Sequence, residues 1–471
     1  MDPILFWNDV AIEVHRRDFA FDKDPVSGQV IGPQQGGPTR TSRALAIVHI
    51  AMYDAWNGAK ATGKNYLGQG GRPALPTAPS PVPAPKLGAA AGVAVAGAAM
   101  TALKSLFSNQ LAYIEQKMLE YCATSTAATL TATQISAYEN YGRQVAEVLL
   151  MLRDPMVDKS DAPESYVAGG SPGDHRPDPY NPSQGYLGSR WGHVTPFCVN
   201  SPVGPMALAA YLAAPPAFGT APYRADFREV RDRGAKARNL RTQNEEMTGL
   251  YWAYDGAKGL GTPPRLYNQI VRKIVDKLSM VPATTPTTDA LARLFAMVHA
   301  GMADAGIVAW EGKYTYNLWR PVIGIREDDS GTGPTGLGAA NSATGDPAWE
   351  PYGAPNSNRV GDKNFTPPFP AYPSGHATFG TTVLEIVRQF FSLDPTTFKF
   401  KFVSDELNGI TKDINGSVRT RIEREYNIKS AIQDNYESRV WLGVHWRFDG
   451  TGGVQAGTAV ANQVFTGTCF P

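Results

Sequence analysis

Apolar residues recur three and four positions apart along most of the chain, which places them on one face of an α-helix. In the segment 376–391, for example, Phe379, Val383 and Phe390 fall on the same face. This spacing predicts an all-α fold. The segments predicted to be helical are 40–57, 86–107, 109–122, 131–152, 223–254, 265–278, 288–310, 376–391, 404–414 and 428–442.

Stretches rich in proline and glycine separate these helices. Residues 68–85, 154–222 and 328–369 lack helical periodicity and are predicted to be long loops. The last of them lies between two clusters of polar residues described below, so we expect it to shape the entrance to a site. At 471 residues and 42% hydrophobic content, the chain can bury a large core in two or three structural units.

The composition excludes several kinds of partner and site. The chain has 44 Lys and Arg against 43 Asp and Glu, and this net charge of +1 argues against a nucleic-acid-binding surface. Its three cysteines, Cys122, Cys198 and Cys469, lie far apart and form no CxxC pair. Neither a disulfide framework nor a zinc site is therefore predicted.

No segment of the sequence is predicted to enter a membrane. The first nine residues lack the basic start and the long apolar run of a secretory signal peptide, so we expect a soluble protein whose localisation stays open. The run 87–103 is uncharged, but it consists mostly of Ala, Gly and Val and is typical of a buried, closely packed helix. No coiled-coil heptad marks a partner surface, so the oligomeric state is not predicted.

Three clusters of polar and small residues in the last third of the chain indicate its chemistry. They cover residues 313–321, 373–376 and 438–449. A lysine and two arginines supply positive charge and directed N–H donors, a serine and a glycine add neutral donors, and two histidines can bind a ligand or exchange protons. Each residue alone is more often solvated or part of a core, but together they predict a pocket for a tetrahedral oxyanion.

The spacing within the first cluster has a physical reason. Lys313 and Arg320 are seven residues apart, which is almost two helical turns. A helix that continues through both would therefore place the two cationic groups on one face. Pro321 is predicted to end this helix directly after Arg320.

The other two clusters are predicted to lie at helix ends. Ser374 and Gly375 follow a run of prolines and precede the helix 376–391, so they are expected at a helix N-terminus. Free N–H groups and the positive end of the helix dipole favour an anion there. Gly443 is predicted to end the last helix and to leave His445 on a turn.

The three clusters match the signature K-x6-RP, PSGH and SR-x5-H-x3-D, whose parts are intact and in order. The sequence thereby resembles the superfamily of vanadium-dependent haloperoxidases and type-2 phosphatidic acid phosphatases. The resemblance implies two four-helix bundles, one in residues 1–250 with long loops and one in residues 251–471 that carries the site. The interval of 61 residues between His376 and Ser438 is longer than is usual in the phosphatases, and this favours the haloperoxidase branch.

The resemblance also implies a role for the residues of the three clusters. His445 is similar to the axial ligand of vanadium, or to the nucleophile of a phosphatase, and His376 to the general acid–base. Lys313 is similar to the lysine that donates a hydrogen bond to a bound peroxide. The residues implied as a cradle for the equatorial oxygens of the anion are Lys313, Arg320, Ser374, Gly375 and Arg439.

Three residues outside the clusters resemble supporting groups of the family. Asp255 is similar to an aspartate that pairs with the arginine numbered Arg439 here. Trp310 and Phe369 resemble the aromatic residues that line the halide site of chloroperoxidases, although both could equally be core residues. A histidine is usual at the position of Phe369 in algal bromoperoxidases, so the phenylalanine points to the chloroperoxidase type.

The implied activity is that of a vanadate-dependent haloperoxidase, without haem or flavin. It would oxidise chloride or bromide with hydrogen peroxide to hypohalous acid, which halogenates a small organic acceptor. The alternative is a soluble acid phosphatase, in which His445 becomes a phosphohistidine and His376 protonates the departing alcohol. Vanadate and phosphate are nearly isosteric, so the sequence leaves both open. A non-catalytic phosphate-binding protein is disfavoured, because such a protein needs neither histidine.

The other histidines are not predicted to take part in the chemistry. His49 lies at helical spacing in an apolar helix and is expected to be a hydrogen-bonded core residue. His299 is expected to pack in the same way. His15, His175 and His193 have no ligand partners at a recognisable spacing, so no role is assigned to them.

Overall fold

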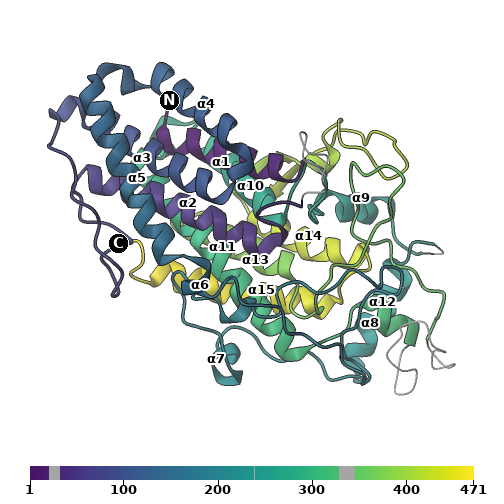
Figure 1. Ribbon diagram of the computed structural model, residues 1–471. Coiled ribbons are helices and arrows are strands. Elements are labelled where there is room, and N and C mark those ends of the chain that lie inside the picture. Colours follow the sequence, from purple (N-terminus) through teal and green to yellow (C-terminus); the bar gives the residue numbers. More distant parts are fainter. Residues whose placement is uncertain (21–31, 238, 328–344) are drawn as a thin grey trace.

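The prediction of an all-α fold is confirmed. A computed structural model describes residues 1–20, 32–237, 239–327 and 345–471, and within these ranges the regular structure is helical apart from one antiparallel pair of strands (Figure 1). The elements are α1 Pro3–Asp18, α2 Gly37–Ala59, α3 Ala84–Leu106, α4 Leu111–Thr124, α5 Ala132–Leu152, α6 Pro155–Asp158, α7 Pro205–Ala209, α8 Ala221–Arg233, α9 Gln243–Tyr251, α10 Pro263–Leu278, α11 Thr288–Tyr316, α12 Pro321–Glu327, α13 Gly375–Phe390, β1 Lys399–Val403, β2 Glu423–Asn427, α14 Ile428–Trp441 and α15 Arg447–Thr466.

Helices α2, α3 and α5 pack together in the N-terminal half, on the purple and blue side of Figure 1. A Cβ atom at Gly97 of α3 would overlap the backbone of Glu139 in α5, and one at Gly142 of α5 would overlap the backbone of Ala94 in α3. The run 87–103 is thus a buried, closely packed helix, as predicted. Helices α3 and α11 are long and apolar enough to span a membrane, but 72% and 94% of their apolar windows are buried inside the protein.

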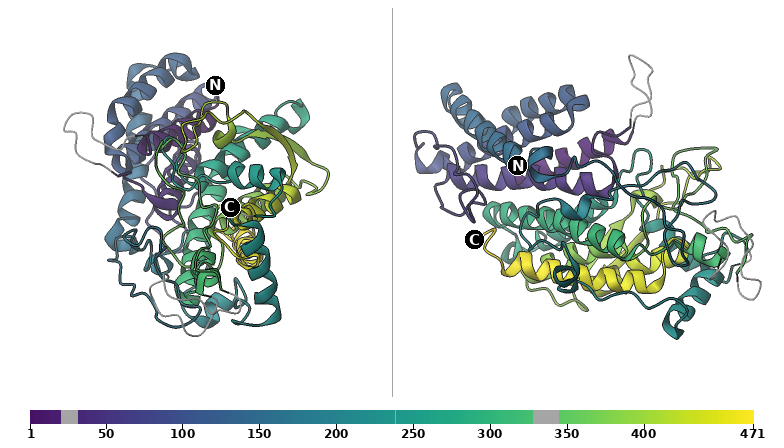
Figure 2. Two further views of the ribbon diagram at one scale, coloured as in Figure 1. Left: turned by 90° about the vertical axis from the view of Figure 1, so that its right-hand side faces the viewer. Right: turned by 60° about the horizontal axis from the view of Figure 1, so that its bottom comes forward.

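Helix α11 runs through the centre of the molecule, with α2 on one side and α13 and α15 on the other (Figures 1 and 2). Helix α15 approaches α13 through glycines. A Cβ at Gly453 would lie 2.7 Å from the carbonyl oxygen of Ser374, and one at Gly457 would lie 2.6 Å from that of Thr378. The two helices therefore touch backbone to backbone, and this contact fixes the start of α13 against α15.

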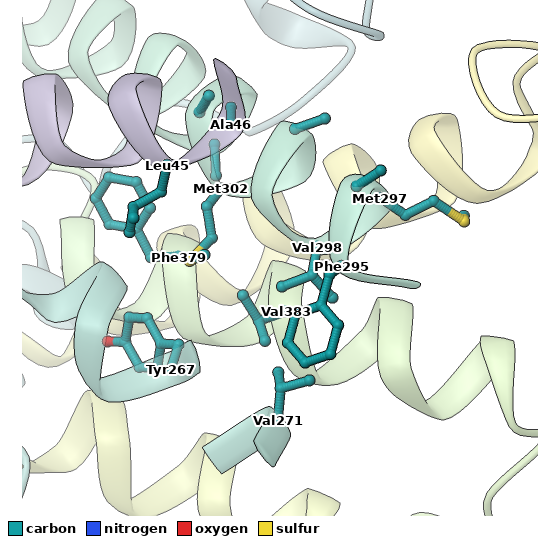
Figure 3. Packing of buried hydrophobic residues seen from close by; sticks show 14 of the residues in the cluster. Leu45, Ala46, Tyr267, Val271, Phe295, Met297, Val298, Met302, Phe379 and Val383 are labelled. Atoms are coloured by element: carbon teal, nitrogen blue, oxygen red, sulfur yellow. The ribbon is translucent and has the colours of Figure 1, made fainter. Parts of the chain in front are cut away.

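The apolar core is continuous between the two halves of the chain. Leu45 of α2, Met302 of α11 and Phe379 of α13 belong to one cluster of buried residues, and Figure 3 shows them side by side with Val383. The two halves thus share one core, and the division into two bundles at residue 250 stays a prediction. The number of helices in each bundle stays a prediction.

The prediction of a single helix over 223–254 is wrong. The chain forms α8 and then α9, and the described residues between them are not helical. The second helix has its own start signal, because the side chain of Thr242 accepts a hydrogen bond from Glu245 N while the Glu245 side chain accepts one from Thr242 N. This capping box satisfies N–H groups that a continuous helix would have bonded internally.

The prediction of a helix over 404–414 is also wrong. Only a short 3-10 turn, η5 (Asp405–Leu407), forms there, and it is followed by turns. The flanking strands β1 and β2 were not predicted, although Phe400 and Phe402 alternate with exposed lysines as in a half-buried strand. Gly409 adopts a φ of 84° in the connecting segment, which an α-helix does not allow.

Candidate active site

Lys313 and Arg320 meet at one site, but not on one helix face. Helix α11 ends at Tyr316, and Asn317 adopts a left-handed conformation with φ 49° that closes the helix. Arg320 follows in a non-helical stretch, and Pro321 begins α12 instead of ending α11. The predicted helix through both cations is therefore wrong, while their predicted proximity is found.

The ammonium group of Lys313 is fully buried and donates to three backbone carbonyls. Its Nζ lies 2.9 Å from Pro370 O, 3.1 Å from Ala371 O and 2.6 Å from Pro373 O. These three bonds use every donor of the ammonium. Burial, together with the nearby Arg320 guanidinium, lowers the pKa of Lys313 well below its ordinary value. Lys313 thus holds the loop before Ser374 and places a positive charge behind it.

The two arginines are oriented by different partners. Arg320 donates from Nε to Phe369 O at 2.8 Å and from Nη1 to Val444 O at 2.8 Å. Arg439 forms the predicted ion pair with Asp255, with Nη2–Oδ1 and Nη1–Oδ2 distances of 2.7 and 3.0 Å. Among the described residues, no partner is present for Arg320 Nη2 or Arg439 Nε, and both atoms are buried.

The start of α13 lies where the sequence predicted it. Ser374 is the N-cap, its side chain accepts a hydrogen bond from Ala377 N at 3.4 Å, and Gly375 is the first helical residue. The backbone of Ser374 is held by a hydrogen bond from its N–H to Asp449 O at 2.8 Å. A Cβ at Gly375 would lie 3.3 Å from the Trp310 ring, a tight contact that glycine avoids while it leaves this helix end open.

His445 lies on the turn after Gly443, whose φ is 70°. Its Nδ1 is 2.8 Å from Asp449 Oδ2, and its Nε2 is 2.9 Å from Arg320 Nη1. A guanidinium can only donate, so Nε2 must carry a lone pair, Nδ1 carries the proton, and Asp449 Oδ2 accepts the hydrogen bond from Nδ1. Burial lowers the pKa of His445 well below its ordinary value. The ring is thereby presented as a neutral ligand through Nε2.

His376 is anchored by a backbone carbonyl. Its Nε2 lies 2.6 Å from Ala253 O, which can only accept, so Nε2 carries the proton and Nδ1 carries the lone pair. Burial, with a smaller contribution from the charge of Arg439, lowers the pKa of His376 to about 3. A bound anion would oppose this shift, because negative charge favours the protonated ring.

Some of these groups border a cavity of about 140 Å³. Asp255, His376, Arg439 and His445 form its polar part, and most of its walls are apolar or aromatic. The rings of Trp310 and Phe369 lie 4.8 Å apart in the wall, with Lys313 Nζ 5.0 Å from the Phe369 centroid. The further apolar residues that line the cavity are Pro38, Leu187, Pro263, Phe365, Pro367, Pro368 and Phe379.

Comparison with known proteins identifies the family. A family model for the vanadium chloroperoxidase N-terminal domain matches residues 1–224, and one for its second helical-bundle domain matches residues 293–468. The vanadium chloroperoxidase of Curvularia inaequalis is 33% identical over 507 aligned residues, which cover 95% of this chain and 78% of that protein. The chain belongs to the vanadium haloperoxidase family.

Solved structures of vanadium haloperoxidases share the fold. A structure described as the first bacterial vanadium-dependent iodoperoxidase superposes with a TM-score of 0.68 at 21% identity, covering 98% of this chain and 95% of that chain. An apo-type bacterial vanadium-dependent chloroperoxidase gives 0.59 at 14% identity, with 95% and 99% covered. Proteins named for two different halides therefore have this architecture, so the fold alone does not assign the halide.

Membership of the vanadium haloperoxidase family implies a vanadate cofactor, and the residues present fit such a group. Lys313, Arg320 and Arg439 bring three buried cations together, against the carboxylates of Asp255 and Asp449. The two unpartnered guanidinium atoms need acceptors, and vanadate oxygens are acceptors. His445 is neutral and its Nε2 carries a lone pair, which accepts from Arg320 Nη1 here and could bind a transition metal once that hydrogen bond is released.

The structure also shows functional contacts that the sequence did not reveal. The carbonyls of Ala253, Phe369 and Val444 orient His376 and Arg320, and such groups carry no side-chain signal. Asp449 was part of the signature without an assigned role, and it orients His445 and the backbone of Ser374. Its spacing of four residues from His445 was the available signal.

Two of the remaining histidines, His49 and His299, pack together in the core. His49 is a hydrogen-bonded core residue, as predicted, with Nδ1 2.7 Å from Leu45 O. His299 stacks on it with ring centroids 3.7 Å apart and contacts Asn268 Oδ1 at 2.9 Å, which confirms the packing expectation.

Proposed function

We propose that this protein is a vanadate-dependent haloperoxidase that oxidises a halide with hydrogen peroxide to hypohalous acid. The observation that carries the proposal is the lone pair of His445 Nε2, which is held among buried cationic groups whose remaining N–H donors lack acceptors. The substrates in the names of its relatives support the same reaction. Bound vanadate would supply Lewis-acid activation of hydrogen peroxide toward a halide.

In this proposal different residues bind the metal and the oxygens of the anion. His445 holds the metal through Nε2, while Arg320, Arg439, Ser374 and the N–H of Gly375 hold the oxygens of the anion. Lys313 adds positive charge from behind the loop, which withdraws electron density from bound oxygen atoms. None of these groups is exposed, so their charges act in a medium of low dielectric constant.

His376 is proposed to take up and return protons during turnover. Its Nε2 is fixed on Ala253 O, and this leaves Nδ1 as the atom that can accept a proton. A ring held by one nitrogen keeps the other in a constant position, which is what proton exchange with a bound ligand requires.

The apolar wall supports the chloroperoxidase type and an organic acceptor. Trp310 and Phe369 present rings next to cationic groups, and a halide can bind where a low dielectric constant strengthens the attraction of those cations. An apolar cavity of about 150 Å³ is large enough for a benzene-sized ring, and the cavity here measures about 140 Å³. We therefore propose a small, largely apolar acceptor that can enter the cavity as far as its polar part, which Asp255, His376, Arg439 and His445 form.

The two-part organisation belongs to the same proposal. Residues 251–471 supply the groups around the oxyanion, and residues 1–250 supply part of the wall through Gly37, Pro38 and Leu187. The first part would thus contribute to acceptor selection and the second to the chemistry. The phosphatase alternative is not favoured by the family, and the experiment below keeps it as an outcome.

The deciding experiment measures halogenation of a dimedone-type acceptor by metal-stripped protein with hydrogen peroxide and chloride or bromide. Reactions with and without added vanadate run beside hydrolysis of nitrophenyl phosphate. Vanadate-dependent halogenation supports the proposal, and activity with chloride supports the chloroperoxidase type. Phosphatase activity that vanadate inhibits, without any halogenation, would make His445 a phosphoryl acceptor and refute it.

A further inference from the structure

Three residues after α9 orient two of the proposed site residues. The carbonyl of Ala253 accepts the hydrogen bond from His376, and the carboxylate of Asp255 accepts both hydrogen bonds from Arg439. Tyr254 lies between them with φ 47°, a left-handed conformation that a bulky residue rarely adopts. The Ala253 carbonyl and the Asp255 carboxylate point to His376 and Arg439 only in this backbone conformation. Such a strained conformation persists where surrounding contacts stabilise it.

A buried carboxylate supplies that stabilisation. Glu406 is 0% exposed, and its Oε1 accepts a hydrogen bond from Tyr254 N at 3.1 Å. Its Oε2 accepts from Ser357 Oγ at 2.5 Å and from Arg419 Nη1 at 2.6 Å. The carboxylate is thus fixed by two groups on one side and holds the backbone of Tyr254 on the other.

Glu406 comes from a part of the chain that no site motif covers. It lies in η5, between β1 and β2, inside the long interval that separates His376 from Ser438. The neighbouring residues of η5 strengthen the same contact. Asp405 N donates to Tyr254 Oη at 2.7 Å, and the side chain of Ser404 donates to Tyr251 O at 2.6 Å. Residues of the segment 399–427 therefore hold the chain at the end of α9 in place through hydrogen bonds.

We propose that Glu406 is a positioning residue of the active site, which holds residues 253–255 so that His376 and Arg439 face the bound oxyanion. The inference rests on the proposed function and extends the site by one layer. Groups that orient the ligands of a metal change metal affinity or activity by about 10- to 100-fold when they are replaced. A purely structural role for the pair Glu406 and Arg419 would instead affect stability alone.

The test compares Glu406→Gln with Asp413→Asn. Asp413 is the other carboxylate on Arg419, at 3.3 Å from Nη2, and Arg419 does not contact Tyr254. In Glu406→Gln, a side-chain oxygen turned to Arg419 places the amide N–H₂ against Tyr254 N–H, two donors that cannot bond. Vanadate affinity of the metal-free proteins, kcat and the thermal midpoint are measured for both variants and for the wild type.

We expect Glu406→Gln to weaken vanadate binding and to lower kcat by about tenfold each, while Asp413→Asn changes both less than about twofold. Equal losses of thermal stability in the two variants, with vanadate affinity and kcat unchanged, would overturn the inference. If Glu406→Gln does not fold, Glu406→Asp keeps the charge for Arg419 but shortens the reach to Tyr254 N, and the same losses are expected. A wild type that binds vanadate but oxidises no halide would refute the proposed function, while the affinities still test Glu406.

Discussion

Replacing Asp255 by alanine removes the only carboxylate that the structure places on Arg439 among the described residues. The lost contacts are two hydrogen bonds of 2.7 and 3.0 Å, and the Arg439 side chain is 1% exposed. Breaking a buried ion pair from one side costs about 3–5 kcal/mol, because the other charge stays buried without a counter-ion. We expect Asp255→Ala to lower the free energy of unfolding by at least about 3 kcal/mol, a large part of a typical total of about 5–15 kcal/mol.

Chemical denaturation of the vanadate-free protein, followed by circular dichroism, measures this loss. Asp9→Ala is the matched control, because Asp9 pairs with Arg272 at 3.0 Å but is 55% exposed. Pairs of that kind contribute about 0–1 kcal/mol. Vanadate at one hundred times its dissociation constant should add about 2.7 kcal/mol to Asp255→Ala, because the anion binds the folded protein and not the unfolded chain.

Equal losses in the two variants would refute this reasoning. That result would mean that the charge of Arg439 is compensated by water or by the protein around it, so that the cost of an unpaired guanidinium does not apply. If added vanadate does not reduce a large loss of unfolding free energy, the contribution of the Asp255–Arg439 ion pair to stability is independent of oxyanion binding.

Three further predictions follow from the same geometry. His445→Ala should abolish vanadate retention, measured by equilibrium dialysis, together with turnover, because the site loses its histidine lone pair. Phe369→His should shift the ratio of chloride to bromide oxidation toward bromide, measured with a dimedone-type acceptor, because a polar group enters the wall. Burial lowers the pKa of His49 from 6.5 to about 4, so below pH 6.5 the unfolded chain binds this proton more readily than the folded one. This group should therefore reduce the free energy of unfolding by up to about 3 kcal/mol between pH 6.5 and 4, and His49→Gln should lose that share of the pH dependence.

Each of these predictions has an outcome that contradicts it. Halide oxidation at the wild-type rate by His445→Ala in dilute vanadate would exclude His445 as the ligand. An unchanged halide ratio in Phe369→His would show that Phe369 is an ordinary core residue. An identical slope of stability against pH in His49→Gln and the wild type would mean that other groups carry the acid sensitivity.

The side chains of the site could be predicted because their types and spacing are chemical requirements. Lys313, Arg320 and His445 were all expected at one anion site, and the structure brings the three side chains close together. The backbone path that joins Lys313 and Arg320 was predicted wrongly. Asn317 takes a left-handed conformation and turns the chain before Arg320, and no apolar pattern records such a turn.

Backbone groups account for most of what the sequence could not predict. The carbonyls that hold Lys313 belong to Pro370, Ala371 and Pro373, and their positions depend on the path of the loop and not on residue identity. The role of Glu406 could not be predicted for a related reason. A glutamate in a polar segment is usually solvated, and only the tertiary structure shows that this one is buried against Tyr254.

The glycine contact between α13 and α15 determines how freely the sequence around the site can vary. Gly453 and Gly457 let the backbone of α15 rest on that of Ser374 and Thr378, so the spacing between the N-terminal end of α13 and Asp449 is set by main-chain atoms. The same arrangement makes the two glycines intolerant of any side chain, even a methyl group, although neither takes part in the reaction.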